Sequence, residues 1–504
     1  MKALHINGNG LTLEAVREVV VEHRAVLLDP DARDAVDRAR AVVDALVAGN
    51  RLAYAITTGV GKLADVRIAG EQIRELQVNL VRSHAAGVGE ALSIAETRAM
   101  MLLRANSLSK GYSGVRAVVI DTLCEMLNRG VTPFVPSQGS VGASGDLAPL
   151  AHLALALTGE GECLDDKGTR IPAAEALRRA QVKPLVLEAK EAVSLINGTQ
   201  GMLAVGTLAL LAAETLVDTA DVVGAMTLDA LRGTDVAFDD RIHKARPHSG
   251  QIKTAENLRK MLEGSGIRES HRDCARVQDA YSLRCTPQIL GAVGEALGFA
   301  AGLVTTELNA ATDNPLVFGD DVISGGNFHG QPIALALDVL GIALATLAGL
   351  AERRIERIVN PDLSSGLPAF LARQPGLESG FMTAQIAAAA LVADARVLAT
   401  PASVQSVPTE GNQEDVVPMG MTAAWKAERI FADAARIVAI ELLAAAQGLE
   451  FLKPLTPARG VARTYAAVRA EVTALDEDRP MSAEIERVAA GVRAGRFDPG
   501  EGVS

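Results

Sequence analysis

Apolar side chains recur along most of this chain with the spacing of α-helices. In the first third, one predicted helix covers residues 11–23 and has Thr12 as its cap. The same spacing predicts further helices over residues 29–48, 71–90, 96–109 and 112–129. Residues 29–48 are the clearest case, with the amphipathic pattern of a helix that covers a core.

Between residues 194 and 448 the apolar stretches are longer and turn signals are fewer. They predict helices over residues 201–230, 287–311, 332–358, 380–399 and 421–447. Several of these are about twice the average helix length, and helices of that size bury one another in bundles. The charged tail, residues 464–504, is predicted to be helical with a break at Arg479 and Pro480.

The pattern therefore predicts a mainly α protein, an elongated bundle of long helices with a loop-rich N-terminal region. We expect three parts: an N-terminal region of residues 1–200, a central bundle of residues 201–460 and a helical tail of residues 461–504. Two stretches of the first part lack a helical period. Residues 51–61 are rich in Thr and Gly, and residues 131–150 are dense in Pro, Gly and Ser. A long loop between strong helices is usually functional.

Composition narrows the class of protein. The 504 residues are 49% hydrophobic and only 3% aromatic, which supports a large helical core and argues against an all-β sandwich. Lys and Arg number 49 against 61 Asp and Glu, for a net charge of −12. A nucleic-acid partner is therefore disfavoured, because such proteins carry a basic surplus.

Cysteine usage and hydropathy indicate a cytoplasmic protein. Its four cysteines include no CxxC pair, which argues against a disulfide framework or a zinc site. The N-terminus shows no secretion signal. Residues 193–213 are uncharged and residues 332–351 are interrupted only by Asp338, and both are interpreted as buried helices. No membrane partner is expected.

The loop of residues 131–150 contains a tripeptide capable of unusual chemistry, Ala143-Ser144-Gly145, followed by Asp146. Attack of the Gly145 amide nitrogen on the Ala143 carbonyl would close a five-membered ring. Loss of two waters would then give a methylidene-imidazolone (MIO), an electrophilic alkene made from the chain itself. Gly145 leaves room for the attack and Ser144 supplies the leaving hydroxyl. Taken alone, however, the tripeptide is common and is usually an ordinary turn.

Its surroundings change that interpretation. The sequence GSVGASGDLAPLAHLAL resembles the electrophile loop of the histidine and aromatic amino acid ammonia-lyase family. Further segments of that family follow in its order between about residues 8 and 455: YAITTGVGK (54–62), NLVRSHAAGVG (79–89), LINGTQ (195–200), QDAYSLRCTPQ (278–288), NPLVF (314–318), GGNFHGQP (325–332) and NQEDVVPM (412–419). The closest likeness is to the histidine ammonia-lyases.

This resemblance implies a carbon–nitrogen lyase that eliminates ammonia from an amino acid. An amine is a poor leaving group, and the β-hydrogen is a weak acid. An MIO formed from Ala143, Ser144 and Gly145 would address the first difficulty, with no external cofactor and no metal. Tyr54 would be the base. A free Tyr has a pKa near 10, so the phenolate needs roughly 4 kcal/mol of help at pH 7, which we expect from positive potential such as helix N-termini.

The resemblance also implies roles for the remaining residues of the site. Asn197 and Tyr281 would hold the electrophile and the substrate amine, and Arg284 would clamp the substrate carboxylate with its planar fork. Gln278 and Phe328 would line the pocket. The family forms homotetramers with active sites shared between subunits, so we expect a homotetramer here.

Two positions favour histidine as the substrate. Ser83-His84 resembles the histidine lyases, and Glu414 stands where they carry an acid and the aromatic lyases usually carry Gln. A carboxylate can accept a hydrogen bond from an imidazole N–H, so this pair suits L-histidine and its product trans-urocanate.

Other positions depart from the bacterial histidine lyases: Val416, Pro418, Gly330-Gln331, Ala55 and Val60. A tyrosine or other aromatic ammonia-lyase therefore stays open, as does a related 2,3-aminomutase. A non-catalytic helical assembly protein is a remote alternative, because Tyr54, Ser144 and Arg284 are all present together. The sequence leaves open whether the ring has formed, and in which pathway the enzyme works.

Overall fold

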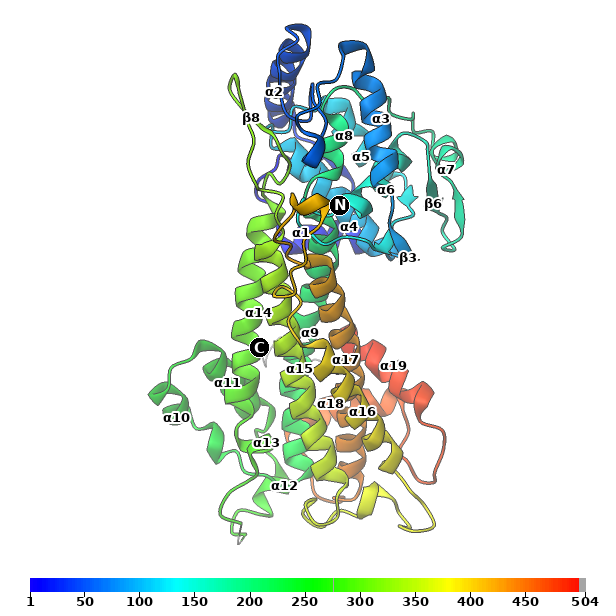
Figure 1. The fold of residues 1–504 in the computed structure, drawn as a ribbon. Helices are drawn as coiled ribbons and strands as arrows, with labels where there is room; N and C mark the ends of the chain where they lie inside the picture. The colour runs from blue at the N-terminus through cyan, green and yellow to red at the C-terminus, as the bar shows by residue number, and fades with distance from the viewer. Residues whose placement is uncertain (275, 498–504) are drawn as a thin grey trace. The chain divides into compact units, whose positions relative to one another are not determined.

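The computed structural model describes residues 1–274 and 276–497, and this part of the chain is mainly helical (Figure 1). It contains nineteen α-helices, and its nine strands are only two to four residues long. The strands form four small sheets of two or three members. The predicted mainly α fold is confirmed.

The chain divides into two compact units. The first consists of Met1–Leu208, Ala301–Asp338 and Pro401–Trp425. The second consists of Ala209–Ala300, Val339–Thr400 and Lys426–Ser504. Four of the five boundaries fall inside long helices, and the fifth follows Thr400 in a loop. The sequence-based division at residues 200 and 460 follows the chain and stays a prediction.

The first helices of this unit begin at side-chain caps, of which Thr12 was predicted from the sequence. In α1 (Leu13–Val21) the Thr12 hydroxyl accepts a hydrogen bond from the Ala15 N–H at 3.1 Å. Asp29 caps α2 (Pro30–Ala48) in the same way. Ser93 and Glu96 form a complete capping box on α4 (Ile94–Ser109). These side chains satisfy backbone donors that the helix itself leaves unpaired.

Two predicted helices are shorter than expected. The helix over residues 71–90 is instead α3 (Ile73–His84), and the chain then forms strand β3 (Val88–Ala91), which pairs with β5 (Pro136–Gln138). Gly89 adopts a φ of +89° in this strand, which a helix cannot contain. The helix predicted from residue 112 begins only at Ala117 as α5 (Ala117–Asn128).

The remaining elements of the first unit are short. The helices are α6 (Leu147–Leu157), α7 (Ala173–Arg179) and α8 (Glu191–Ile196), with 3₁₀ turns η1 (Gly61–Leu63), η2 (Gly70–Gln72) and η5 (Glu410–Asn412). Strand β1 (Leu4–Ile6) pairs in parallel with β2 (Val26–Leu28). The antiparallel sheets are β4 (Thr132–Pro133) with β6 (Glu162–Leu164) and β7 (Arg170–Pro172), and β8 (Leu316–Phe318) with β9 (Asp321–Ile323).

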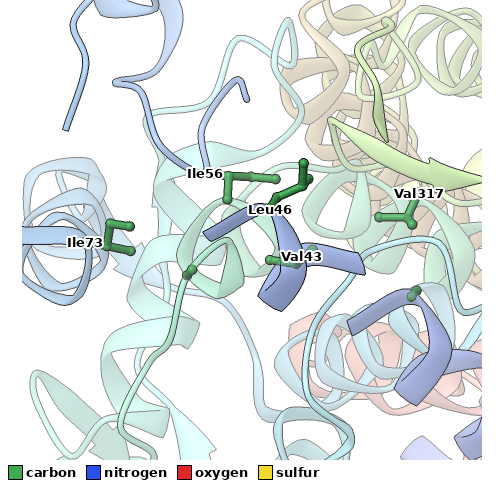
Figure 2. Packing of buried hydrophobic residues seen from close by; sticks show 7 residues of the cluster. Val43, Leu46, Ile56, Ile73 and Val317 are labelled. Atoms are coloured by element: carbon green, nitrogen blue, oxygen red, sulfur yellow. The ribbon is translucent and has the colours of Figure 1, made fainter. Parts of the chain in front are cut away.

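An apolar cluster in this unit fixes the loop of residues 51–61. Figure 2 shows Ile56 beside side chains from α2, with Ile73 and Val317 contributed by other segments. Ile56 is fully buried. Burial of one such side chain stabilises the fold by about 1.5–3 kcal/mol, so the loop is anchored although it has no regular structure.

All five long predicted helices appear within three residues of their expected ends, four of them as α9 (Gln200–Ala230), α14 (Thr286–Leu308), α15 (Gln331–Val359) and α16 (Met382–Leu398). The fifth, α17 (Gly420–Glu450), extends the prediction by one residue at its start and three at its end. By length and composition alone, α9, α14 and α15 could each cross a membrane, although 67% of the apolar window of α9 and of α15 is buried.

The second unit adds shorter elements: η3 (Val236–Phe238), α10 (Asp240–Ala245), α11 (Ser249–Met261), α12 (Gly266–Glu269), α13 (Tyr281–Arg284), η4 (Ala369–Leu371), α18 (Arg459–Glu471) and α19 (Ser482–Arg493). The gap between α18 and α19 agrees with the predicted break at Arg479 and Pro480. The last residues of the predicted tail, 498–504, lie outside the described part.

Candidate active site

A cavity of about 530 Å³ in the first unit gathers most of the predicted site residues. It is lined by segments that are far apart in the chain. They are the Tyr54 loop, the end of α3, the loop that contains Ala143-Ser144-Gly145 (the tripeptide loop), the end of α8, the loop after β9 and the segment around η5. The predicted residues in its wall are Tyr54, His84, Ala143, Ser144, Asn197, Phe328 and Glu414.

The tripeptide loop is tightly bent on both sides of Ser144, at Gly142 and at Gly145. Gly142 and Gly145 have φ values of +77° and +73°, a conformation that side chains disfavour. A Cβ atom on Gly145 would lie 2.2 Å from the carbonyl oxygen of Gly198, so only glycine permits this approach. The Asp146 N–H donates to the same oxygen at 2.7 Å. The glycine requirement predicted from the chemistry is thus also a packing requirement.

Hydrogen bonds from other segments hold this loop. The Gly330 N–H donates to the Gly142 carbonyl at 3.0 Å, and the Met419 N–H donates to the Val141 carbonyl at 2.9 Å. Asp146 is fully buried and accepts from the Ser140 hydroxyl and from the Met202 N–H, both at 2.7 Å. Burial raises the pKa of Asp146 to about 6, against the lowering effect of these bonds.

Ser144 is held on both of its backbone polar groups. The Asn197 side-chain amide donates to the Ser144 carbonyl at 2.7 Å, and the Ser144 N–H donates to Glu414 Oε1 at 3.1 Å. Arg104, which is fully buried, donates to the Asn197 carbonyl at 2.8 Å. Its burial lowers the Arg104 pKa to about 10, so the guanidinium stays charged at pH 7 beneath the loop.

Tyr54 is placed by two threonines and by η1. The Thr57 and Thr58 hydroxyls accept from the Ala53 and Ala55 N–H groups, at 2.9 and 3.1 Å. The Tyr54 hydroxyl oxygen accepts from the Gly61 N–H at 3.0 Å. These bonds hold Tyr54, which lines the cavity, on both sides of its loop.

The surroundings of Tyr54 do not show the positive potential that was expected to lower its pKa. Burial raises the pKa of its hydroxyl and so does the negative charge of Glu410, while the Gly61 hydrogen bond lowers it by less. Within this unit the surroundings favour the neutral phenol.

His84 has a defined ring orientation. Its Nδ1 lies 2.8 Å from the Leu80 carbonyl oxygen. A carbonyl can only accept, so Nδ1 carries the hydrogen and Nε2 of the neutral ring is an acceptor. Such an acceptor suits a donor on a substrate ring.

Glu410 was missed from the sequence. It lines the cavity and accepts a hydrogen bond from the Lys62 backbone N–H, while a Cβ on Gly61 would lie 1.6 Å from Glu410 Oε1. Burial raises the pKa of the Glu410 carboxyl and so does the nearby charge of Glu414. The only sequence signal for Glu410 was its position four residues before Glu414. The packing of Glu410 against η1 could not be predicted, because it depends on the folded chain.

Two further supporting groups were also missed. The Asn314 side chain accepts from the Gly325 N–H at 2.7 Å and so shapes the loop that carries Phe328. Lys190 and Asp313 form a fully buried ion pair at 3.2 Å. None of these three residues was predicted as a supporting group, because a polar residue near a turn is common in any sequence.

Gln278, Tyr281 and Arg284 are not in the wall of this cavity. All three belong to the second unit, where Gln278 and Arg284 line another cavity of about 650 Å³. Tyr281 is 69% exposed, and the Arg284 guanidinium stacks 4.7 Å from the centre of its ring. The structure thus pairs Tyr281 with Arg284 but does not show their predicted contact with a substrate.

Comparison with known proteins identifies the family. The model of the family described as aromatic amino acid lyase matches residues 11–470. Two similar proteins are histidine ammonia-lyases: that of Koribacter versatilis is 61% identical over 99% of both chains, and that of Myxococcus xanthus is 52% identical over 98% of this chain and 97% of the other.

Solved structures agree with this fold. Histidine ammonia-lyase from Trypanosoma cruzi aligns with a TM-score of 0.91 at 41% identity, covering 99% of this chain and 94% of that one. Tyrosine aminomutase from Streptomyces globisporus aligns with a TM-score of 0.94, also at 41% identity, covering 98% and 97%. The match over nearly the whole chain, together with the placement of Ser144 and Tyr54 in one cavity, shows that this protein belongs to the aromatic amino acid lyase family.

Proposed function

We propose that the protein deaminates L-histidine to trans-urocanate and ammonia, with an MIO formed from Ala143, Ser144 and Gly145. The observation that carries this proposal is one cavity lined by Ser144, Tyr54, His84 and Glu414. The names of the histidine ammonia-lyases of Koribacter versatilis and Myxococcus xanthus support the same substrate. As a member of its family the protein is a carbon–nitrogen lyase.

The residues around the tripeptide fit the formation of this group. Gly145 is pressed against Gly198 with no room for a side chain, and the Asn197 amide already donates to the Ser144 carbonyl. That carbonyl becomes the ring carbonyl, so the same donor would hold it after closure. When formed, the ring supplies an electrophilic alkene that activates the substrate amine as a leaving group. No external cofactor or metal is proposed.

Tyr54 is proposed as the base that removes the β-proton. Tyr54 lines the cavity and its hydroxyl oxygen accepts from the Gly61 backbone N–H, so it could take a proton from substrate once deprotonated. Because burial and Glu410 raise its pKa, the phenolate depends on positive charge supplied when the complete site assembles.

We propose that a second copy of the chain supplies that charge in a homotetramer. Arg284 stacks on the exposed Tyr281, and the Arg284 Nε is buried with no hydrogen-bond partner within the described residues. Arg284 would bind the substrate carboxylate, Tyr281 would contact the amine, and Gln278 would complete the wall. We further propose a cytoplasmic enzyme without nucleic-acid or membrane partners.

The ring of the substrate is proposed to lie against His84, Glu414 and Phe328. In its protonated form the histidine ring offers one N–H to the Glu414 carboxylate and the other to the His84 Nε2 acceptor. A tyrosine hydroxyl satisfies His84 alone, and a phenylalanine ring satisfies neither. Glu414 is half-buried, and of these three substrates only histidine gives its carboxylate a ring donor, which favours histidine.

A tyrosine lyase or 2,3-aminomutase is the second candidate. Val416 lines the cavity where the histidine lyases place His, and the tyrosine aminomutase of Streptomyces globisporus has a closely similar fold. A lyase releases the ammonia, whereas an aminomutase adds it back to the substrate. The motion of a lid over the site can decide between these outcomes.

Steady-state assays separate the candidates. We expect kcat/KM to fall in the order histidine, tyrosine, phenylalanine, with urocanate identified by its absorbance. The variant Glu414→Gln should lower the histidine value most. A wild-type preference for tyrosine, or a histidine rate that Glu414→Gln leaves unchanged, would transfer the assignment to an aromatic lyase or mutase.

A further inference from the structure

We propose that Glu414 has a second role: it accepts the Ser144 amide proton while the electrophile is being formed. This inference rests on the proposed function, because it concerns the making of the same group. It assigns Glu414 to the maturation of the enzyme, before any substrate binds.

The geometry places the carboxylate on the proton that must leave. Ser144 and Glu414 are 270 positions apart, yet the Ser144 N–H donates to Glu414 Oε1 at 3.1 Å. The other carboxylate oxygen, Oε2, accepts from the Thr409 hydroxyl, and the Thr409 N–H donates to the Glu414 carbonyl at 2.9 Å. The carboxylate is therefore fixed on both oxygens and by its own backbone.

Ring closure requires the loss of this proton. The Gly145 nitrogen bonds to the Ala143 carbonyl carbon, and the Gly145 proton passes to that oxygen. The resulting hydroxyl leaves as the Ser144 nitrogen forms a double bond to the same carbon, which it can do only by losing its hydrogen. Glu414 takes that hydrogen and returns it to the departing hydroxyl, giving the first water. The Ser144 Cα hydrogen and side-chain hydroxyl leave as the second.

The other polar groups nearby are committed to different contacts. The Asn197 amide is a donor and already holds the Ser144 carbonyl. Asp146 is buried and accepts from Ser140 and Met202. The Tyr54 oxygen accepts from Gly61. Among the described residues, Glu414 is thus the carboxylate in hydrogen-bond contact with the Ser144 N–H.

Maturation would also change what Glu414 can bind. In the precursor, Oε1 is occupied by the Ser144 N–H. In the closed ring that nitrogen carries no hydrogen, so the bond no longer exists and Oε1 becomes free to accept from a substrate imidazole. The same carboxylate would serve first the loop and then the substrate.

The test follows ring formation itself rather than turnover. The full chain is synthesised in a cell-free system, and intact mass is recorded over time for the loss of two waters. We compare the wild type with Glu414→Gln and with a matched control, Glu410→Gln, which removes the neighbouring acid that contacts Lys62 instead of Ser144. Gln retains the accepting oxygen but cannot hold the proton, so the expected result is maturation at least about tenfold slower in Glu414→Gln alone.

Two further variants guard against a folding defect. Glu414→Asp keeps a carboxylate and should mature faster than Glu414→Gln, and Thr409→Val, which frees the carboxylate without altering it, should show a smaller delay. Equal maturation rates in the wild type and Glu414→Gln, or no advantage of Asp over Gln, would overturn the proposal. A wild-type chain that keeps its full mass would instead overturn the proposed function.

Discussion

The two cavities of this protein differ in what builds them. The cavity of the first unit is lined by backbone turns and by acids, with Glu410, Glu414 and Asp415 in its wall. The cavity of the second unit is lined by five arginines, Arg232, Arg268, Arg272, Arg276 and Arg284, of which Arg268 and Arg276 form ion pairs with Asp235 and Asp279 of the same wall. The first has its reactive groups fixed by many hydrogen bonds, whereas Tyr281 beside the second is mostly exposed.

This contrast matches the two ends of an amino acid. An amine or an imidazole N–H is a donor and suits acids, while a carboxylate suits the planar fork of an arginine. Under the proposed function, the first unit would hold the groups for the reaction and for the substrate ring, and the second would offer Arg284 for the carboxylate. We propose that the complete site needs both, and the following changes test that division.

The largest effect is expected from Ser144→Ala, which removes the hydroxyl lost in ring formation. The variant should keep its full mass, whereas the wild type should be two waters lighter, and turnover should fall by at least about 10³-fold, in the range seen when a covalent-catalysis group is deleted. The control is Ser137→Ala, which alters a buried serine outside the tripeptide. An unmodified mass in active wild type would contradict the electrophile.

Tyr54→Phe should reduce kcat/KM by at least about 10²-fold, because a positioned base is lost. The phenyl ring keeps nearly the same volume, so the thermal unfolding temperature and the oligomeric state should be unchanged. Tyr112→Phe is a matched control, since Tyr112 packs on Phe318 in the same unit. Near-normal turnover in Tyr54→Phe would assign the proton transfer to another group.

Arg284→Lys probes the second cavity. Lysine keeps the charge but lacks the planar fork, so we expect kcat/KM to fall about tenfold or more. Arg272→Lys changes another arginine of that cavity, whose partner is Glu269, and should have little effect. If the two variants behave alike, the carboxylate role of Arg284 is wrong.

The smallest effect concerns pH. The base form of Tyr54 is the phenolate, so kcat/KM should rise with pH toward the Tyr54 pKa. Because the Glu410 charge raises that pKa, Glu410→Gln should lower it and move the alkaline rise to lower pH. Glu75→Gln, on the exposed side of α3, is the control. A rise that stays in place or moves to higher pH would show that Glu410 does not act on Tyr54.

Much of the fold was predictable because helices depend on nearby residues. The apolar spacing located the long helices, and Thr12 marked a start that the structure confirms to the residue. The error at residues 71–90 arose where Gly89 turns the chain into a strand that pairs with β5. Strand pairing joins distant segments, and a local period carries no information about it.

The sequence by itself determined the family, the reactive tripeptide and the types of residue available, since these are properties of a motif. Only the tertiary structure decided which of them meet. It brought Glu414 onto the Ser144 N–H, Glu410 against Gly61 and Arg104 beneath Asn197, and it placed Arg284 in another cavity. Such contacts join residues tens to hundreds of positions apart, and they exist only when packed helices fix the separate loops at hydrogen-bond distance.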